Sequence, residues 1–166
     1  MDERANQHRA ERPSYAHPRL VAVPNREDAY STLVHDGEYE VAFASADRFE
    51  MWRRPVWSLL FVMLNGDAVG RPILGFLNVP PKDRRPTPGW AFSCMYTVAT
   101  GRRPPHGLAR WNPERFLAGC AFNARVRVVK RDSNGAPRPE SASYSRVQAL
   151  LKLTAGCPPC VRELSR

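Results

Sequence analysis

The run at residues 56–64 is the feature that most limits what this chain can fold into. It is apolar apart from one serine, and Asn65-Gly66-Asp67 and a second apolar run at residues 73–79 follow it. Asn-Gly between two apolar runs favours a β-hairpin, because a tight turn requires residues that tolerate a positive φ. Unbroken apolarity indicates strands that are buried on both faces. We therefore expect this hairpin at the centre of an antiparallel sheet.

Other segments rich in β-branched and aromatic residues are bounded by Gly, Pro, Asn or Asp, a pattern typical of strands. They predict strands at residues 20–23, 39–45, 90–100 and 124–129. In the last of these, arginine and valine alternate from Arg125 before a turn at residues 132–135, which favours a second hairpin. One face of that strand is expected to meet the core and the other the solvent.

Two segments predict helices. Residues 141–155 carry an apolar stripe at Tyr144, Val147, Leu150, Leu151 and Leu153. Ser141 or Ser143 is placed to cap this C-terminal helix, and Gly156 to end it. A shorter helix is expected near residues 112–119, with Pro113 at its first position. The predicted class is α+β: a single domain over residues 20–166, mainly antiparallel sheet, after a mobile polar arm at residues 1–19.

The charge of the chain is strongly positive and is carried by arginine. Arginine supplies 22 of the 25 basic residues, and the formal net charge is +9. Such a charge attracts polyanions, so nucleic acid or an acidic protein is the expected partner. A GC-rich genome would also produce the excess of arginine over lysine. No apolar run reaches the roughly 20 residues of a membrane span, and the N-terminus lacks a signal-peptide core, so we expect an intracellular protein of the nucleus or cytoplasm.

Arginine steps in loops, an alternating strand face and two tryptophans beside charges form the predicted nucleic-acid contacts. Arginine holds phosphates, and an exposed indole ring stacks on unpaired bases. The alternative for any tryptophan of a small β-rich protein is a place in the core. The candidate contact residues are Arg53, Arg54, Arg84, Arg85, Arg102, Arg103, Arg125, Arg127, Trp52 and Trp111.

Four cysteines give the chain its sharpest local motif, Cys157-Pro-Pro-Cys160. Two thiolates at this spacing bind one zinc ion, and Cys94 and Cys120 would complete four ligands. Histidine ligands from His35 or His106 are a second version of one structural zinc site. Cys94 and Cys120 have apolar neighbours, however, where cysteine is often a small hydrophobic residue. A redox role or an interchain disulfide remains a further alternative for the motif.

Linear motifs of catalysis are missing from the sequence. It contains no phosphate-binding loop, no dinucleotide-binding glycine pattern, no zinc-protease helix and no hydrolase elbow. No histidine is followed two residues later by glutamate, which excludes the usual zinc deaminase pattern. We therefore expect a protein that is not an enzyme, although a site assembled in space would leave no such motif.

The C-terminal half resembles the small non-structural nuclear phosphoprotein of bocaparvoviruses. The resemblance is carried by Pro88-Gly89-Trp90 and by Cys157-x-x-Cys160 near the C-terminus. It implies a nuclear viral accessory factor acting in viral DNA replication and transcript processing. Only Cys157 and Cys160 would carry over as site residues, because the family's N-terminal part is disordered whereas residues 20–79 here have the pattern of a folded segment.

The sequence thus favours a basic regulatory or viral accessory protein that binds nucleic acid through an arginine-rich surface. A second hypothesis is a protein-interaction module, such as a host-interaction or immune-evasion factor, that docks a partner through its hairpin or an open sheet edge. The third hypothesis is an enzyme whose site has no linear motif.

Overall fold

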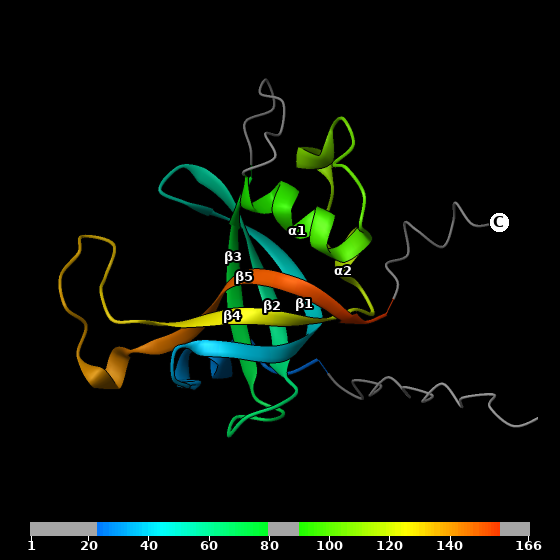
Figure 1. Cartoon of the computed structure of the whole chain (residues 1–166). Coiled ribbons are helices and arrows are strands. Elements are labelled where there is room, and N and C mark those ends of the chain that lie inside the picture. Colours follow the sequence, from blue (N-terminus) through cyan, green and yellow to red (C-terminus); the bar gives the residue numbers. More distant parts are fainter. Residues whose placement is uncertain (1–22, 80–89, 157–166) are drawn as a thin grey trace, which may run out of the picture.

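The computed structural model describes residues 23–79 and 90–156 of the chain, and five β-strands dominate it (Figure 1). The strands are β1 (Gly37–Met51), β2 (Arg54–Met63), β3 (Pro72–Asn78), β4 (Ala121–Val129) and β5 (Tyr144–Ala155). Two α-helices, α1 (Ala91–Thr100) and α2 (Glu114–Leu117), stand between β3 and β4. Short 3-10 turns form η1 (Glu27–Ser31), η2 (Leu108–Arg110) and η3 (Glu140–Ala142).

The strands close into a barrel in the order β1-β2-β3-β5-β4. β1 closes it by pairing with β2 on one side and with β4 on the other, both antiparallel. β5 lies between β3 and β4, antiparallel to β4 and parallel to β3 at Leu74 and Gly75. Closure leaves few strand edges unpaired, which protects an apolar sheet from pairing with other chains.

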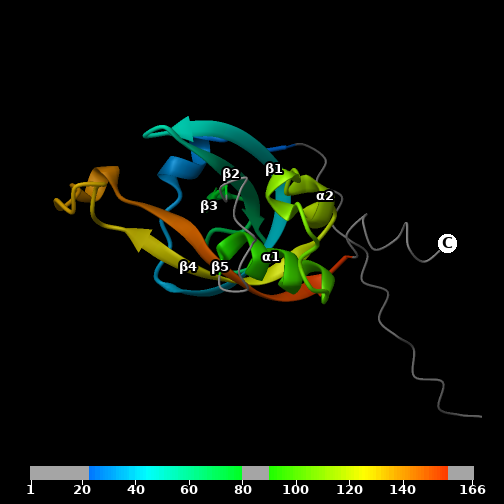
Figure 2. The same cartoon turned by 90° about the horizontal axis from the view of Figure 1, so that it is seen from above.

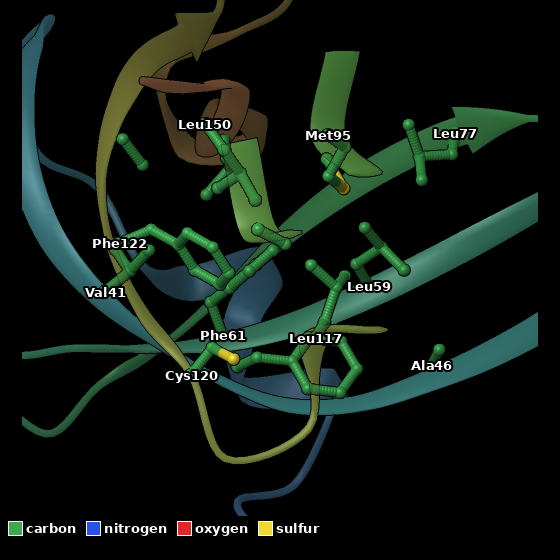
Figure 3. Close-up of a cluster of buried hydrophobic side chains, with 14 of the residues drawn as sticks. Val41, Ala46, Leu59, Phe61, Leu77, Met95, Leu117, Cys120, Phe122 and Leu150 are labelled. Carbon is green, nitrogen blue, oxygen red and sulfur yellow. The ribbon is translucent and has the colours of Figure 1, made fainter. Parts of the chain in front are cut away.

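Alternating residues of the strands fill the barrel. Leu59, Phe61 and Met63 of β2 point inward and belong to one buried cluster. α1 adds Met95 and the segment after α2 adds Cys120 to the same cluster (Figure 3). Figure 2 shows α1 and α2 together on one side of the barrel, so these helices cover one end of the core. Burial of this cluster is the main stabilising term of the fold.

The α+β class and the mainly antiparallel sheet are confirmed. The predicted central hairpin is present as β2 and β3, which pair from Val56 with Asn78 to Val62 with Pro72. The short helix predicted near residues 112–119 is α2. The predicted arm at residues 1–19 lies outside the described residues, and so does the strand predicted at residues 20–23 apart from Val23.

The predicted C-terminal helix is wrong, because residues 144–155 form β5. The β4–β5 register skips Gln148, Leu151 and Thr154, one extra residue in every three. Each skip is a β-bulge, which restarts the inward and outward alternation. Val147, Leu150 and Leu153 therefore belong to or pack against the core cluster at a spacing of three, which imitates the stripe of a helix.

The strand predicted at residues 90–100 is also wrong, because this segment forms α1. Its buried side chains include Phe92, Met95, Tyr96 and Ala99, the spacing of one helical face. Gly101 ends the helix in the left-handed conformation with φ 69°. Aromatic and β-branched residues had favoured a strand, but the helical stripe decides how this segment packs.

None of the helices in residues 23–79 and 90–156 is long and apolar enough to cross a membrane.

Candidate nucleic-acid interface

The outer side of β1, β2 and β3 forms a surface that we call the strand face. Strand pairing places its side chains in three rows, because residues opposite each other in an antiparallel pair share one side of the sheet. The rows are Ser45, Leu60 and Leu74; Asp47, Ser58 and Phe76; and Phe49, Val56 and Asn78. The last row lies nearest the β1–β2 turn, at the tip of the hairpin that projects from the barrel in Figure 1.

The first row is covered by the N-terminal segment. Ala29 of η1 is fully buried and packs in one cluster with Leu60 and Leu74. η1 contacts β3 and β5, and its blue turn lies on the left of the barrel in Figure 2. Glu27 and Asp28 of η1 are exposed and acidic. This end of the strand face is therefore closed, and its charge is mixed, because Arg71 donates to Oγ of Ser31 in η1 and Arg146 stands opposite Leu74.

Arg26 holds the N-terminal segment on the strand face. Its Nη1 donates to the carbonyl oxygen of Ser58 at 3.0 Å and to the hydroxyl of the same residue. Its Nη2 donates to Oγ of Ser45 at 3.1 Å and pairs with Oδ2 of Asp47 at 2.6 Å. The arginine side chain is only 25% exposed, so these bonds are partly shielded from water. One guanidinium thus ties the segment to two strands.

Replacing Arg26 by alanine should destabilise the barrel by about 1–3 kcal/mol, because it leaves the buried Ser58 and the Asp47 carboxylate without their partner. Urea denaturation followed by far-UV circular dichroism measures the change. Arg26→Lys keeps the charge beside Asp47 but lacks the planar fork that serves both strands, so it should lose part of this energy. A free energy of unfolding that is equal in Arg26→Ala and wild type would contradict the role assigned to Arg26.

Two phenylalanines form the open end of the strand face. Phe49 is 37% exposed and Phe76 is partly exposed. Their ring centroids are 6.3 Å apart, at an interplanar angle of 76°. They lie diagonally across β2, on either side of Val56, which is only 4% exposed. The two rings therefore lie over Val56 and form a partly exposed aromatic platform, in which Phe76 also packs against the cluster of Leu60 and Leu74.

Basic residues lie at one end of this platform. Arg54 pairs with Met51 at the end of the hairpin, which puts it on the same side of the sheet as Phe49. Arg53, the neighbouring residue of the β1–β2 turn, adds a second charge at this end, whereas Arg146 of β5 stands opposite Leu74 in the first row, at the closed end. Arg53 and Arg54 are both exposed. A ligand on the platform would therefore have its cations within reach at the β1–β2 turn.

The β1–β2 turn has an unusual backbone. Met51 pairs with Arg54, so Trp52 and Arg53 alone make the turn, with φ of 48° and 61°. Trp52 is 72% exposed, and Arg53 is exposed as well. Among the predicted contact residues that the structure describes, this turn brings Trp52, Arg53 and Arg54 together.

The other predicted contact residues lie elsewhere. Arg125 and Arg127 project from β4 and form ion pairs with acids near the start of β1. Arg125 lies 3.7 Å from Glu38, and Arg127 lies 3.6 Å from Asp36. Arg102 and Arg103 are exposed beyond the C-terminal end of α1. Arg84 and Arg85 lie outside the described residues. The arginine steps of the described chain thus do not share one surface.

Trp111 has a different environment from Trp52. It is half-buried, makes an edge contact with Tyr96 at 5.8 Å and packs against the core cluster. The guanidinium of Arg115 stacks over its ring at 3.9 Å. This indole already has a cation and an aromatic ring as neighbours, so it is less available to a base than Trp52.

Phe49 and Phe76 were missed by the sequence analysis. Phe76 lies in a continuous apolar run, where no alternation with polar residues shows which side chains point out of the barrel. Phe49 had a weak signal, because it stands alone among charged residues in a stretch that alternates.

The predicted zinc ligands are described only in part. Cys94 is exposed on α1, whereas Cys120 is 2% exposed and belongs to the core cluster. Cys157 and Cys160 lie outside the described residues. Within residues 23–79 and 90–156, no three His, Cys, Asp or Glu side chains form a group able to hold a metal. The zinc site stays a prediction.

A groove of about 1150 Å³ opens on another part of the barrel. It lies between residues 33–39, the β2–β3 turn and the β4–β5 connection. Its charged lining is mixed, because Arg71, Lys130 and Arg138 alternate with acids. The acids are Asp36, Asp67 and Glu140. The groove is therefore less suited to a polyanion than the open end of the strand face.

The barrel, the aromatic platform and the hairpin tip thus define the candidate interface from the chain's own geometry. Comparison of the chain with protein-family models, with curated proteins and with solved structures gave no match.

Proposed function

We propose that this protein binds single-stranded nucleic acid on the open end of the strand face. The observation that carries the proposal is the partly exposed pair Phe49 and Phe76, set on the outer side of a closed barrel with Arg54 on the same side of the sheet at the hairpin tip. Aromatic rings stack on unpaired bases without regard to sequence, and arginine holds the phosphates between them.

The architecture supports this proposal. OB-fold proteins are five-stranded Greek-key barrels that bind oligonucleotides or oligosaccharides over their second and third strands. Phe76 lies on β3, and Phe49 reaches across β2 from β1. Because one fold serves many functions, the choice of ligand rests on the site itself. The net charge of +9 favours a polyanion over a neutral sugar.

Charge also limits where a nucleic-acid ligand can lie on the strand face. Glu27 and Asp28 of η1 border the closed end of the strand face, whereas Arg53 and Arg54 border the open end. The closed end is covered by η1 and has a mixed charge, whereas the open end attracts a phosphate backbone. We therefore place the ligand between the hairpin tip and the second row of the strand face, with its bases on the two phenylalanine rings.

An unpaired strand is the better ligand for this platform. In a duplex the bases are stacked on one another, so an aromatic side chain reaches them only in loops, bulges or ends. Binding of a fluorescein-labelled oligothymidylate or oligouridylate of about 12 nucleotides, within the footprint of such barrels, tests the proposal by fluorescence anisotropy. A duplex of the same length should bind more weakly at equal salt.

Salt dependence should reveal the phosphate contacts. With about three contacts, the logarithm of the association constant should fall against the logarithm of salt concentration with a slope of about −2. Titrations at several concentrations of potassium chloride measure this slope. Arg53→Ala/Arg54→Ala should flatten it, because each lost phosphate contact removes about 0.7 from the slope.

Arg102→Ala/Arg103→Ala is the matched control, since it removes the same charge from an exposed pair beyond α1. Its slope should stay within experimental error of the wild-type slope. Equal effects of the two double variants would show that only the total charge matters. Failure of the wild-type protein to bind any oligonucleotide at low salt would refute the proposed function.

A further inference from the structure

The β1–β2 turn is the one place in the described chain where residues other than glycine have a positive φ. Nine described residues have a positive φ, and seven of them are glycines. The other two are Trp52 and Arg53, at the two central positions of the turn. A two-residue hairpin turn with positive φ at both positions is best made by Asn-Gly. A bulky side chain is rarely found in that conformation.

The fold gains little from these two side chains. Trp52 is 72% exposed and Arg53 is exposed, so neither ring nor guanidinium is buried on folding. The chain itself places Asn65-Gly66 in the β2–β3 turn, where Gly66 has a φ of 78°. Strained residues of this kind cluster at ligand clamps and functional sites, where contact with a partner explains why they are kept.

We infer that Trp52 and Arg53 form a contact finger that is kept for its ligand at the expense of fold stability. The indole of Trp52 stacks on an unpaired base next to those on the platform, and Arg53 and Arg54 hold the adjoining phosphate. This inference rests on the proposed function and extends its site from the platform to the hairpin tip. An indole beside two guanidinium groups fits a base and a phosphate, because the ring has a π-face and each fork matches an anion.

The inference predicts opposite changes in stability and affinity for one variant. Trp52→Asn/Arg53→Gly gives the turn its preferred residues, so the melting temperature should rise by about 2–6 °C. The same variant loses the ring and one charge, so the affinity for the labelled oligothymidylate should fall about tenfold or more. Differential scanning fluorimetry and fluorescence anisotropy measure the two changes on the full-length protein.

Single variants separate the backbone from the side chains. Trp52→Ala keeps the turn unfavourable, so it should lose affinity without gaining stability. Trp52→Phe keeps an aromatic ring and should bind within about threefold of wild type, because any aromatic face stacks on a base. Val69→Ala, at an exposed apolar residue of the β2–β3 loop, is the control and should change neither quantity.

The outcomes distinguish the finger from the proposed function. If wild type binds the oligonucleotide and Trp52→Asn/Arg53→Gly binds equally well, then Trp52 and Arg53 do not contact the ligand. Binding on the platform would be unaffected by that result. A melting temperature that stays level or falls in that variant overturns the claim that the turn costs stability. If wild type binds no oligonucleotide, the proposed function fails, and the finger fails with it.

Discussion

Replacing Phe49 and Phe76 together by alanine is expected to weaken binding of a single-stranded oligonucleotide by at least about 30-fold. Each aromatic side chain that stacks on a base contributes about 1–3 kcal/mol, and the double variant removes two such side chains. The two rings lie on one surface, 6.3 Å apart, so both should contact the same strand. Fluorescence anisotropy with labelled oligothymidylate at constant salt measures the loss.

The double variant also needs a test of folding, because the rings cover Val56. Losing the edge contact and the packing of Phe76 against Leu60 and Leu74 should cost about 3–5 kcal/mol, so circular dichroism must first show that the variant is folded. Phe49→Tyr/Phe76→Tyr is the matched control, since it keeps both aromatic faces and should bind within about threefold of wild type. Tyr30→Ala removes an exposed ring from acidic η1 and should not weaken binding. Unchanged affinity in a folded Phe49→Ala/Phe76→Ala protein would remove the platform from the site.

Gly156→Ala is expected to destabilise the protein by about 2–4 kcal/mol, because an added Cβ meets a closer neighbour here than at any other glycine of the described chain. A Cβ at this position would lie 2.1 Å from the carbonyl oxygen of Gly119 and 2.9 Å from Cα of Cys120. Both neighbours are backbone, which cannot rotate away as a side chain does. The contact lies where Ala155 of β5 pairs with Ala121 of β4, so relief of the clash would open this seam of the barrel.

Gly119→Ala is the matched control for that variant. Gly119 has a φ of 73°, close to the 88° of Gly156, but a Cβ there would meet nothing within 4 Å. The free energy of unfolding should therefore fall only by the cost of placing an L-residue in the left-handed conformation, about 1–2 kcal/mol. Urea denaturation of the two variants isolates the steric part as the difference between them. Equal free energies of unfolding would mean that the backbone contact at Gly156 does not constrain the fold.

The central hairpin could be predicted because its determinants are local. Asn65-Gly66 selects the turn, and the apolar runs on either side of it are each long enough for a buried strand. The short helix at Glu114–Leu117 was predictable for the same reason, since Pro113 precedes a compact apolar segment. The turn motif favoured only a hairpin, and the proline at the first helical position favoured only a helix.

The two errors arose where one sequence fits two periodicities. In β5, a bulge at every third residue spaces Val147, Leu150 and Leu153 as a helix would. The bulges exist because β5 must bend to pair with β4 and meet β3 in a closed barrel. In α1, the reverse occurred: aromatic and β-branched residues favoured a strand, but their burial follows a helical face. Tertiary packing overrides local preference in both segments.

The candidate site could be predicted only at the hairpin tip. Trp52, Arg53 and Arg54 are adjacent in the sequence, so any structure keeps them together. Phe49 and Phe76 are separated by 27 positions and become neighbours only through the pairing of β1, β2 and β3. Arg125 and Arg127 have the same composition as the hairpin arginines, but acids across the strand pair offset their charge.

The amino-acid sequence by itself determined the α+β class, the central hairpin and the positive charge that attracts a polyanion, because composition and short turn motifs act locally. Only the tertiary structure decided which arginines remain available, which aromatic rings share a surface and which end of that surface is closed by Arg26 and η1. Those properties depend on strand register, and register in a closed barrel is set by all five strands at once.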